Sequence, residues 1–146
     1  MLTKHLCDQS YTIHEISSSV GAAGRAQIRS RSISPLHWWR IRPPHEMDLL
    51  DVRTIRSELL KLDVCAHHSW LNAVLGDAAA AIGIALAALR DCGMTNPLVD
   101  AAMSTVVCCA LEGDKAGVTV VLSALRRRQR IDNRCCRLVT AWAQQQ

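Results

Sequence analysis

Residues 96–130 read NPLVDAAMSTVVCCALEGDKAGVTVVLSALRRRQR, and this stretch decides the fold. It predicts two helices joined by a turn at residues 112–114. Asn96 is a preferred N-cap, and Pro97 suits the first helical position because its missing N–H would have no partner there. Gly113 can take the left-handed conformation that ends a helix, and Asp114 is a good cap for the next one. We therefore expect a helical hairpin.

The first helix of this hairpin should lie at the centre of the domain. Its polar stripe is narrow and consists of Asp100, Ser104, Cys108 and Glu112 at steps of four residues. A helix with so little polar surface needs neighbours on several sides. The second helix has a full polar face and should lie at the surface.

The composition indicates one all-α domain. The chain has 146 residues, of which 49% are hydrophobic and only 3% aromatic, and Phe is absent. Such a length fits a single core, and a core of Leu, Val, Ile and Ala suits packed helices better than a sheet. We predict a small bundle of four to five helices.

Three further helices flank the hairpin in this prediction. Residues 48–64 carry an apolar stripe of Val52, Ile55, Leu59 and Leu62, widened by Leu49 and Leu60. Residues 70–92 continue as one helix with an apolar face made of Leu71, Val74, Leu75, Ala78, Ile82, Ala85, Leu86 and Leu89. After Asp132 as a cap, a last helix reaches about residue 144 and buries Cys135, Leu138, Val139 and Trp142. The uncharged run 78–89 is shorter than the roughly 20 residues that span a bilayer.

A faint internal repeat offers another arrangement for residues 70–92. Residues 73–77 (AVLGD) align with residues 110–114 (ALEGD), and residues 84–90 align with residues 120–126 after a one-residue slip. If the repeat is real, Gly76 and Asp77 form a turn like that of Gly113 and Asp114. The domain would then be two stacked helical hairpins plus a C-terminal helix.

Residues 1–45 differ in character and predict a disordered basic tail in front of a helical domain at 46–146. From residue 16 to 45 there is no acidic residue, and serines alternate with arginines. Such a segment cannot bury enough apolar surface to order itself. Two alternatives stay open, a true start at Met47 and an organelle transit peptide, although Asp8 and Glu15 count against the second. Trp38 and Trp39 could bind a membrane surface or bases, but such a pair more often docks back onto the domain.

Charge is the most asymmetric feature of the chain. Residues 126–137 hold six arginines against one acid, and these are Arg126, Arg127, Arg128, Arg130, Arg134 and Arg137. Arginine at a helix C-terminus is favoured by the dipole, so a solvated helix end is the structural interpretation. The functional interpretation is a contact surface for phosphates or for an acidic partner, since arginine binds both in a bidentate way.

A stripe of small residues is the second candidate surface. It consists of Ala73, Gly76, Ala80, Gly83 and Ala87, at steps of three and four residues. Such a face would let another helix approach closely, either from the same chain or from a second subunit.

No catalytic, cofactor or metal motif is recognisable. The seven cysteines are odd in number, form no C-x-x-C pair and follow no secretory signal, which favours reduced thiols and a cytoplasmic location. Cys65, His67 and His68 do not show the repeated ligand spacing of a zinc site. We therefore expect a protein that is not an enzyme and has no cofactor or metal.

Two functions follow from these surfaces. The leading hypothesis is a protein–protein interaction or regulatory module with an unknown protein partner, which could be a second copy bound through the small-residue stripe. The alternative is a non-specific nucleic-acid-binding protein that uses residues 126–137. Salt separates the two, because binding by several arginines to phosphates weakens steeply as salt rises.

Overall fold

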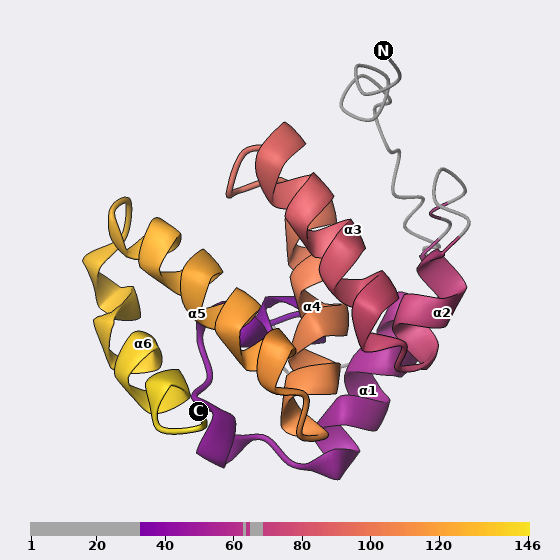
Figure 1. The fold of residues 1–146 in the computed structure, drawn as a ribbon, viewed down its shortest axis with the longest axis horizontal. Helices are drawn as coiled ribbons and strands as arrows, with labels where there is room; N and C mark the ends of the chain where they lie inside the picture. The colour runs from indigo at the N-terminus through magenta and orange to yellow at the C-terminus, as the bar shows by residue number, and fades with distance from the viewer. Residues whose placement is uncertain (1–32, 63, 65–68) are drawn as a thin grey trace, which may run out of the picture.

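The computed structural model describes residues 33–62, 64 and 69–146, and within them the chain is all helical (Figure 1). In chain order the elements are the short 3-10 helices η1 (Pro35–Arg40) and η2 (Pro44–Glu46), then α1 (Leu49–Leu59), α2 (Trp70–Leu75), α3 (Ala78–Asp91), α4 (Pro97–Leu111), α5 (Lys115–Gln129), the 3-10 helix η3 (Asn133–Cys135) and α6 (Cys136–Ala143). The predicted all-α fold is confirmed, with six α-helices in the described part where four to five were expected.

α4 is the central helix, as its narrow polar stripe predicts. Every residue from 99 to 110 is buried, because α1, α3, α5 and η1 all pack against this helix (Figure 1). At its start the Asn96 side chain accepts a hydrogen bond from the backbone N–H of Leu98 (2.8 Å). After its end Gly113 takes a φ of 103°, and Asp114 caps α5. The predicted hairpin of α4 and α5 is therefore confirmed.

The chain from residue 70 to 92 is not one helix. α2 ends at Gly76 in the left-handed conformation (φ 109°), and the Asp77 side chain then accepts a hydrogen bond from the backbone N–H of Ala80 (3.0 Å) to cap α3. The prediction of a continuous helix is wrong, and the turn that the internal repeat predicts is present. α2 and α3 thus form a hairpin that precedes the hairpin of α4 and α5.

The break at Gly76 changes which side chains are buried. Leu71, Leu75 and Leu86, expected on the core face, are 55%, 66% and 52% exposed. α3 instead buries Ala81, Ile84, Ala85, Ala88 and Leu89. A turn reorients the second helix relative to the first, so a stripe drawn along one unbroken helix cannot hold for both.

α1 is shorter than expected but begins as predicted. Asp48 and Asp51 form a reciprocal capping box at its start. The helix ends at Leu59, well before residue 64, and Leu49 and Leu60 are exposed rather than part of the buried stripe. Val52, Ile55 and Leu59 do face the core.

Residues 33–47, which we call the N-terminal arm, pack on the helical domain. η1 lies against α4 and α1, and Trp39 is 1% exposed. The sequence predicts a disordered tail that includes residues 33–45, whereas the structure shows these residues packed on the domain. Residues 1–32 lie outside the described part. Trp38 stays partly exposed under the guanidinium group of Arg42, 4.7 Å from the ring centre. The tryptophan pair docks back onto the domain.

The last helix packs on α5. Asp132 caps η3, which leads into α6, and Leu138 and Trp142 are buried while Val139 is half-buried. No helix in the described part is both long and apolar enough to cross a membrane.

Candidate functional site

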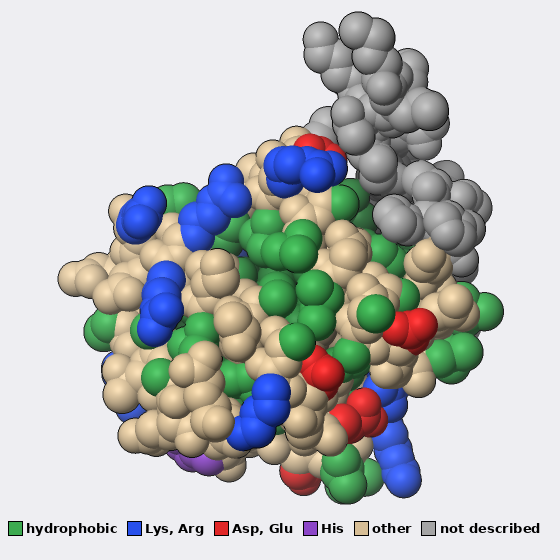
Figure 2. Space-filling view, in the orientation of Figure 1, with side chains coloured by type: hydrophobic (Ala, Val, Ile, Leu, Met, Phe, Trp, Pro, Cys, Tyr) green, Lys and Arg blue, Asp and Glu red, His purple; other side chains and the backbone are tan. Residues whose placement is uncertain are grey.

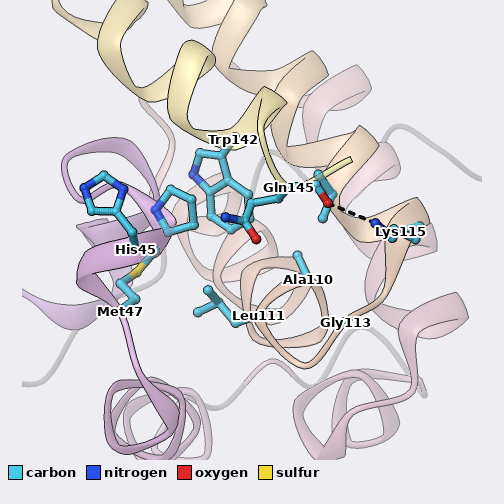
Figure 3. A pocket seen from close by; sticks show the side chains of 10 residues that line it. His45, Met47, Ala110, Leu111, Gly113, Lys115, Trp142 and Gln145 are labelled. Atoms are coloured by element: carbon cyan, nitrogen blue, oxygen red, sulfur yellow. Dashed lines mark hydrogen bonds between the residues drawn. The ribbon is translucent and has the colours of Figure 1, made fainter.

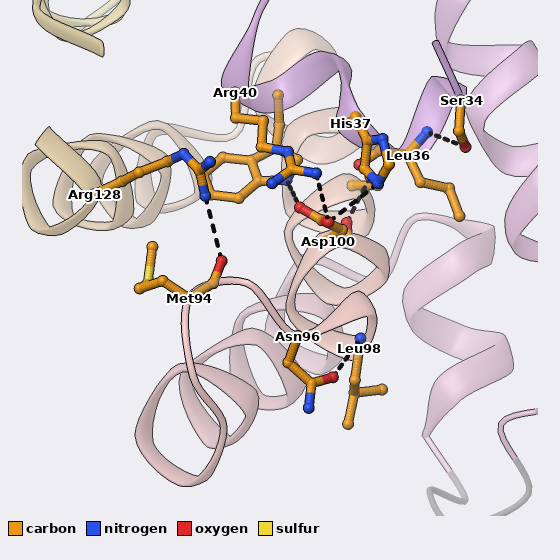
Figure 4. A network of polar contacts seen from close by, with 11 residues as sticks. Ser34, Leu36, His37, Arg40, Met94, Asn96, Leu98, Asp100 and Arg128 are labelled. Atoms are coloured by element: carbon orange, nitrogen blue, oxygen red, sulfur yellow. Dashed lines mark hydrogen bonds and ion pairs between the residues drawn. The ribbon is translucent and has the colours of Figure 1, made fainter. Parts of the chain in front are cut away.

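A buried carboxylate joins the N-terminal arm to α4. Asp100 accepts a hydrogen bond from the indole N–H of Trp39 at Oδ1 (2.9 Å). Its Oδ2 lies 3.0 Å from Nη2 of Arg40 and 3.2 Å from Nε2 of His37, and its side chain is 4% exposed (Figure 4). Burial of a carboxylate is costly unless the group is paired and hydrogen-bonded. Here three donors from η1 meet that requirement.

This network is an anchor rather than an open site. Its donors all come from η1, and the hydroxyl of Ser104 donates to the carbonyl oxygen of Leu36 (3.0 Å). Sequence reasoning missed the network because Trp39 and Asp100 are 61 positions apart. The only local signal was the tryptophan pair itself, together with the lack of polar surface on α4.

A second ion pair ties α1 to the turn that follows α4. Arg56 donates to both carboxylate oxygens of Glu112, at 2.7 and 2.6 Å. Nη2 of Arg56 also lies 2.9 Å from the place that a Cβ on Gly76 would take. Arg56 therefore lies beside both glycine turns, because Glu112 directly precedes Gly113.

The buried thiols are poorly suited to nucleophilic chemistry. Burial raises the pKa of Cys108 to about 12 and also raises the pKa values of Cys109 and Cys135. With these raised pKa values the three thiols stay protonated at neutral pH. Because the thiolate is the reactive form, they are poor nucleophiles. Within the described ranges no group of three His, Cys, Asp or Glu residues is placed to hold a metal ion. Cys65, His67 and His68 lie outside those ranges.

Two of the six predicted arginines brace the fold. Arg127 donates from Nη1 to the carbonyl oxygen of Leu89 (2.8 Å), and Arg128 donates from Nη1 to that of Met94 (3.3 Å; Figure 4). Leu89 lies in the last turn of α3, where carbonyl groups lack helical partners. These arginines link α5 to the end of α3.

The other four arginines, which we call the basic end, are Arg126, Arg130, Arg134 and Arg137. All four are exposed, and their guanidinium groups form no ion pair or hydrogen bond with the rest of the described chain. Figure 2 shows Lys and Arg side chains along the edge of the molecule that α5 and α6 form. Four of the six arginines in the predicted patch thus have no partner among the described residues, and two are used within the fold.

The five small residues do not share one helix face. Ala73 is buried on α2 and Gly76 forms the turn, whereas Ala80 and Ala87 are half-buried on α3. Gly83 is exposed on α3, with no atom within 4 Å of the place its Cβ would take. Because the chain turns at Gly76, the five residues lie on two helices and the turn between them rather than along one helix.

α3 nevertheless presents an exposed stripe that is almost free of charge. The exposed positions are Ala79, Gly83, Leu86 and Arg90, at steps of four, three and four residues. We call the three uncharged members the α3 face. Figure 2 shows hydrophobic side chains gathered between α3 and α5. Arg127 donates to the carbonyl oxygen of Leu89, so α5, which carries Arg126 and precedes Arg130, lies beside α3.

No family model, curated protein or solved structure matches this chain. The chemistry of its surfaces is therefore the basis for a functional proposal. Two surfaces stand out for this purpose, the α3 face and the basic end.

Proposed function

We propose that the protein is an interaction module that binds an acidic amphipathic helix of a partner protein across the α3 face and the basic end. The observation that carries the proposal is the uncharged exposed stripe of α3, together with four exposed arginines that have no partner among the described residues. Binding of an amphipathic helix to an apolar surface is a common mode of protein recognition.

The apolar half of the surface favours a close helix contact. Gly83 leaves open space where a side chain would stand, and Leu86 projects one turn further along with 52% of its surface exposed. The distance between packed helices depends on the side chains at the contact, so glycine and alanine let a second backbone approach closely. Burial of the exposed part of Leu86 would contribute on the order of 1 kcal/mol.

The charged half of the surface favours an acidic partner. Arginine pairs with carboxylates through two parallel hydrogen bonds, and the basic end offers four guanidinium groups with no partner in the described chain. Rim charges of this kind set the rate and orientation of binding more than its strength. An amphipathic helix with Asp or Glu on its polar side would satisfy both halves of the surface.

Selection of displayed 16-residue peptides against the full chain tests this proposal. We expect the enriched peptides to combine helically spaced apolar residues with Asp or Glu. L86E should weaken their binding by about tenfold or more, which corresponds to ~1.4 kcal/mol. The matched control is L71E, because Leu71 on α2 is 55% exposed and Leu86 is 52% exposed. Peptides that bind L86E as tightly as the unchanged chain, or a selection without enrichment, would refute the proposal.

A second candidate function is non-specific nucleic-acid binding by the basic end. It is supported by the same four arginines and needs no apolar contact. L86Q removes the apolar side chain without adding a charge, so it should leave nucleic-acid binding unchanged, which separates this candidate from the first proposal.

A further inference from the structure

α3 and α5 lie side by side and run in the same direction (Figure 1). Near their C-terminal ends Arg127 of α5 donates to the carbonyl oxygen of Leu89 in the last turn of α3. Near their N-terminal ends Oε2 of Glu112 lies 3.8 Å from the place that a Cβ on Gly76 would take. Gly76 directly precedes the cap of α3, and Glu112 comes shortly before the cap of α5. The surface between the two helices therefore has one end where both begin and one end where both finish.

The middle of this surface carries no charge. On α5 the residues Val120, Ser123 and Arg127 follow one another at steps of three and four, so they share one side of the helix. Arg127 reaches α3 from that side. Ser123 is exposed and Val120 is half-buried. We call the α3 face together with Val120 and Ser123 the α3–α5 surface.

Positive charge gathers where the two helices finish. Arg90 is the last member of the exposed stripe of α3, and Arg126 and Arg130 at the end of α5 are exposed without a partner among the described residues. Asp91 lies 2.8 Å from Nε of Arg90 and offsets one of these charges. The arginines still outnumber the carboxylates at this end.

Negative charge gathers where the two helices begin. Asp77 and Asp114 cap α3 and α5 through Oδ1, and neither forms an ion pair within the described chain. Lys115 lies at the same end, but its ammonium group donates to the carbonyl oxygens of Gln145 (3.1 Å; Figure 3) and Gln146 (2.8 Å), which follow α6. Figure 2 shows Asp and Glu side chains near this end of the α3–α5 surface, and Lys and Arg side chains near the other end.

We propose that the partner helix lies antiparallel to α3 and α5, with its acidic side chains in its N-terminal half and its basic side chains in its C-terminal half. The inference rests on the proposed function and adds the direction and the charge order of the partner. The acidic half then faces Arg90 and Arg130, and the basic half faces Asp77 and Asp114.

The helix dipole decides between the two directions. Acidic side chains stabilise a helix near its N-terminus, so an antiparallel partner can place them beside the arginines without cost to its own helix. A parallel partner would need them in its last turns, where the dipole disfavours negative charge. Charges at the rim of an interface also fix its register and orientation.

Paramagnetic NMR of the ¹⁵N-labelled full chain tests the direction. The probe is a 16-residue peptide with leucines at helical spacing, glutamates in its first two turns and arginines in its last two. A nitroxide at the N-terminus of the peptide should broaden the amide signals of Arg90 and Arg130 more than those of Asp77 and Asp114. A nitroxide at its C-terminus should give the reverse pattern, since the two ends of α3 lie about 20 Å apart. The opposite pattern, or equal broadening at both ends, would overturn the inference.

Exchange of charges tests the charge order. A second peptide of the same composition has its glutamates in the last two turns and its arginines in the first two, and it should bind at least about fivefold more weakly. R130E should weaken the first peptide about fivefold and leave the second as it is or tighten it. R53E is the matched control, because Arg53 is exposed on α1 and the change in charge is the same.

The outcomes separate this inference from the proposed function. Failure of both peptides to bind would refute the proposed function and the inference with it. Binding that L86Q weakens, but that is equal for the two peptides, would leave the proposed function standing and overturn the inference. Equal weakening of both peptides by R130E, or the same weakening by R53E, would also overturn it.

Discussion

Trp39 and Asp100 are the two residues on which the N-terminal arm depends. The arm has little regular structure of its own, and its short 3-10 helices could not persist without tertiary contacts. Trp39 supplies both a large buried ring and a donor to a carboxylate that is 4% exposed. A single residue therefore combines apolar burial with the pairing of a buried charge.

W39F should lower the free energy of unfolding by about 1–3 kcal/mol, because the ring volume is largely kept while Asp100 loses one of its donors. The matched substitution is W38F, which removes a ring that is only partly buried and its contact with Arg42. We expect it to cost less than about 1 kcal/mol. Urea denaturation followed by far-UV circular dichroism measures both. Equal losses would contradict the role given to the indole N–H of Trp39.

The thiol of Cys108 should make stability fall in alkaline solution. Its pKa is about 12 in the folded chain against an ordinary value of 9.0. Between these values the unfolded chain has released the proton that the folded chain keeps. The free energy of unfolding should therefore decrease as pH rises above 9, by up to about 1.4 kcal/mol per pH unit. Below pH 9 both states hold the proton, and this contribution disappears.

Comparison of pH profiles checks this prediction. C108A should flatten the decline between pH 9 and 11 relative to the unchanged chain, whatever its effect at neutral pH. C136A alters an exposed cysteine and should keep the original slope. A C108A profile parallel to that of the unchanged chain would show that the thiol of Cys108 ionises as readily in the folded state as in the unfolded state.

At the scale of elements, two glycine–aspartate turns organise the hairpins. Gly76 and Gly113 take φ values of 109° and 103°, and Asp77 and Asp114 each cap the helix that follows. Left-handed backbone is unfavourable for residues with a Cβ. Gly76 carries a further constraint, since Arg56 occupies the space beside it.

G76A should destabilise the protein by about 1–3 kcal/mol, through the positive φ and the 2.9 Å approach of Arg56 Nη2. G83A provides the opposite case, because Gly83 lies inside α3 with open space around it. Alanine there should stabilise the helix by about 0.5–1 kcal/mol. Thermal unfolding of the two variants should move Tm in opposite directions. A G76A variant as stable as G83A would refute the account of the turn.

The sequence predicts those elements whose signals are local. The hairpin of α4 and α5 follows from Asn96, Pro97, Gly113 and Asp114, which act within a few residues of one another. The face of α3 was predicted wrongly because its orientation depends on a turn that only a weak repeat indicated. The docking of η1 depends on the hydrogen bond between Trp39 and Asp100, which are 61 positions apart. No periodic pattern in the arm indicates this contact. The arginine run was visible, but the carbonyl groups that bind Arg127 and Arg128 were not.

For the molecule as a whole, the arm completes the bundle on one side of α4, and the proposed contact surface lies over α3 and α5.

Removal of the arm should destabilise the whole domain. A chain that begins at Met47 lacks Trp39, Arg40 and His37 and leaves Asp100 without these three donors. Loss of a buried tryptophan costs about 3–5 kcal/mol, and unpaired buried groups add to this. We expect a loss of more than about 4 kcal/mol relative to a chain that begins at residue 33, measured by urea denaturation. Similar midpoints for the two chains would show that the arm is not an integral part of the fold.

The measurement that tests the proposed function most directly is fluorescence anisotropy of the full chain with two labelled probes, the best selected acidic peptide and a random 20-base-pair duplex. Each titration is made at 50 and 200 mM salt, with the unchanged chain and with L86Q, which adds no charge. We predict that the peptide binds more tightly than the duplex, loses less than about tenfold in affinity at the higher salt, and binds L86Q more weakly than the unchanged chain. The contrary result is tighter binding of the duplex that is unchanged in L86Q and falls about 150-fold between the two salts, as four phosphate contacts would give. That result would assign the basic end to nucleic acid.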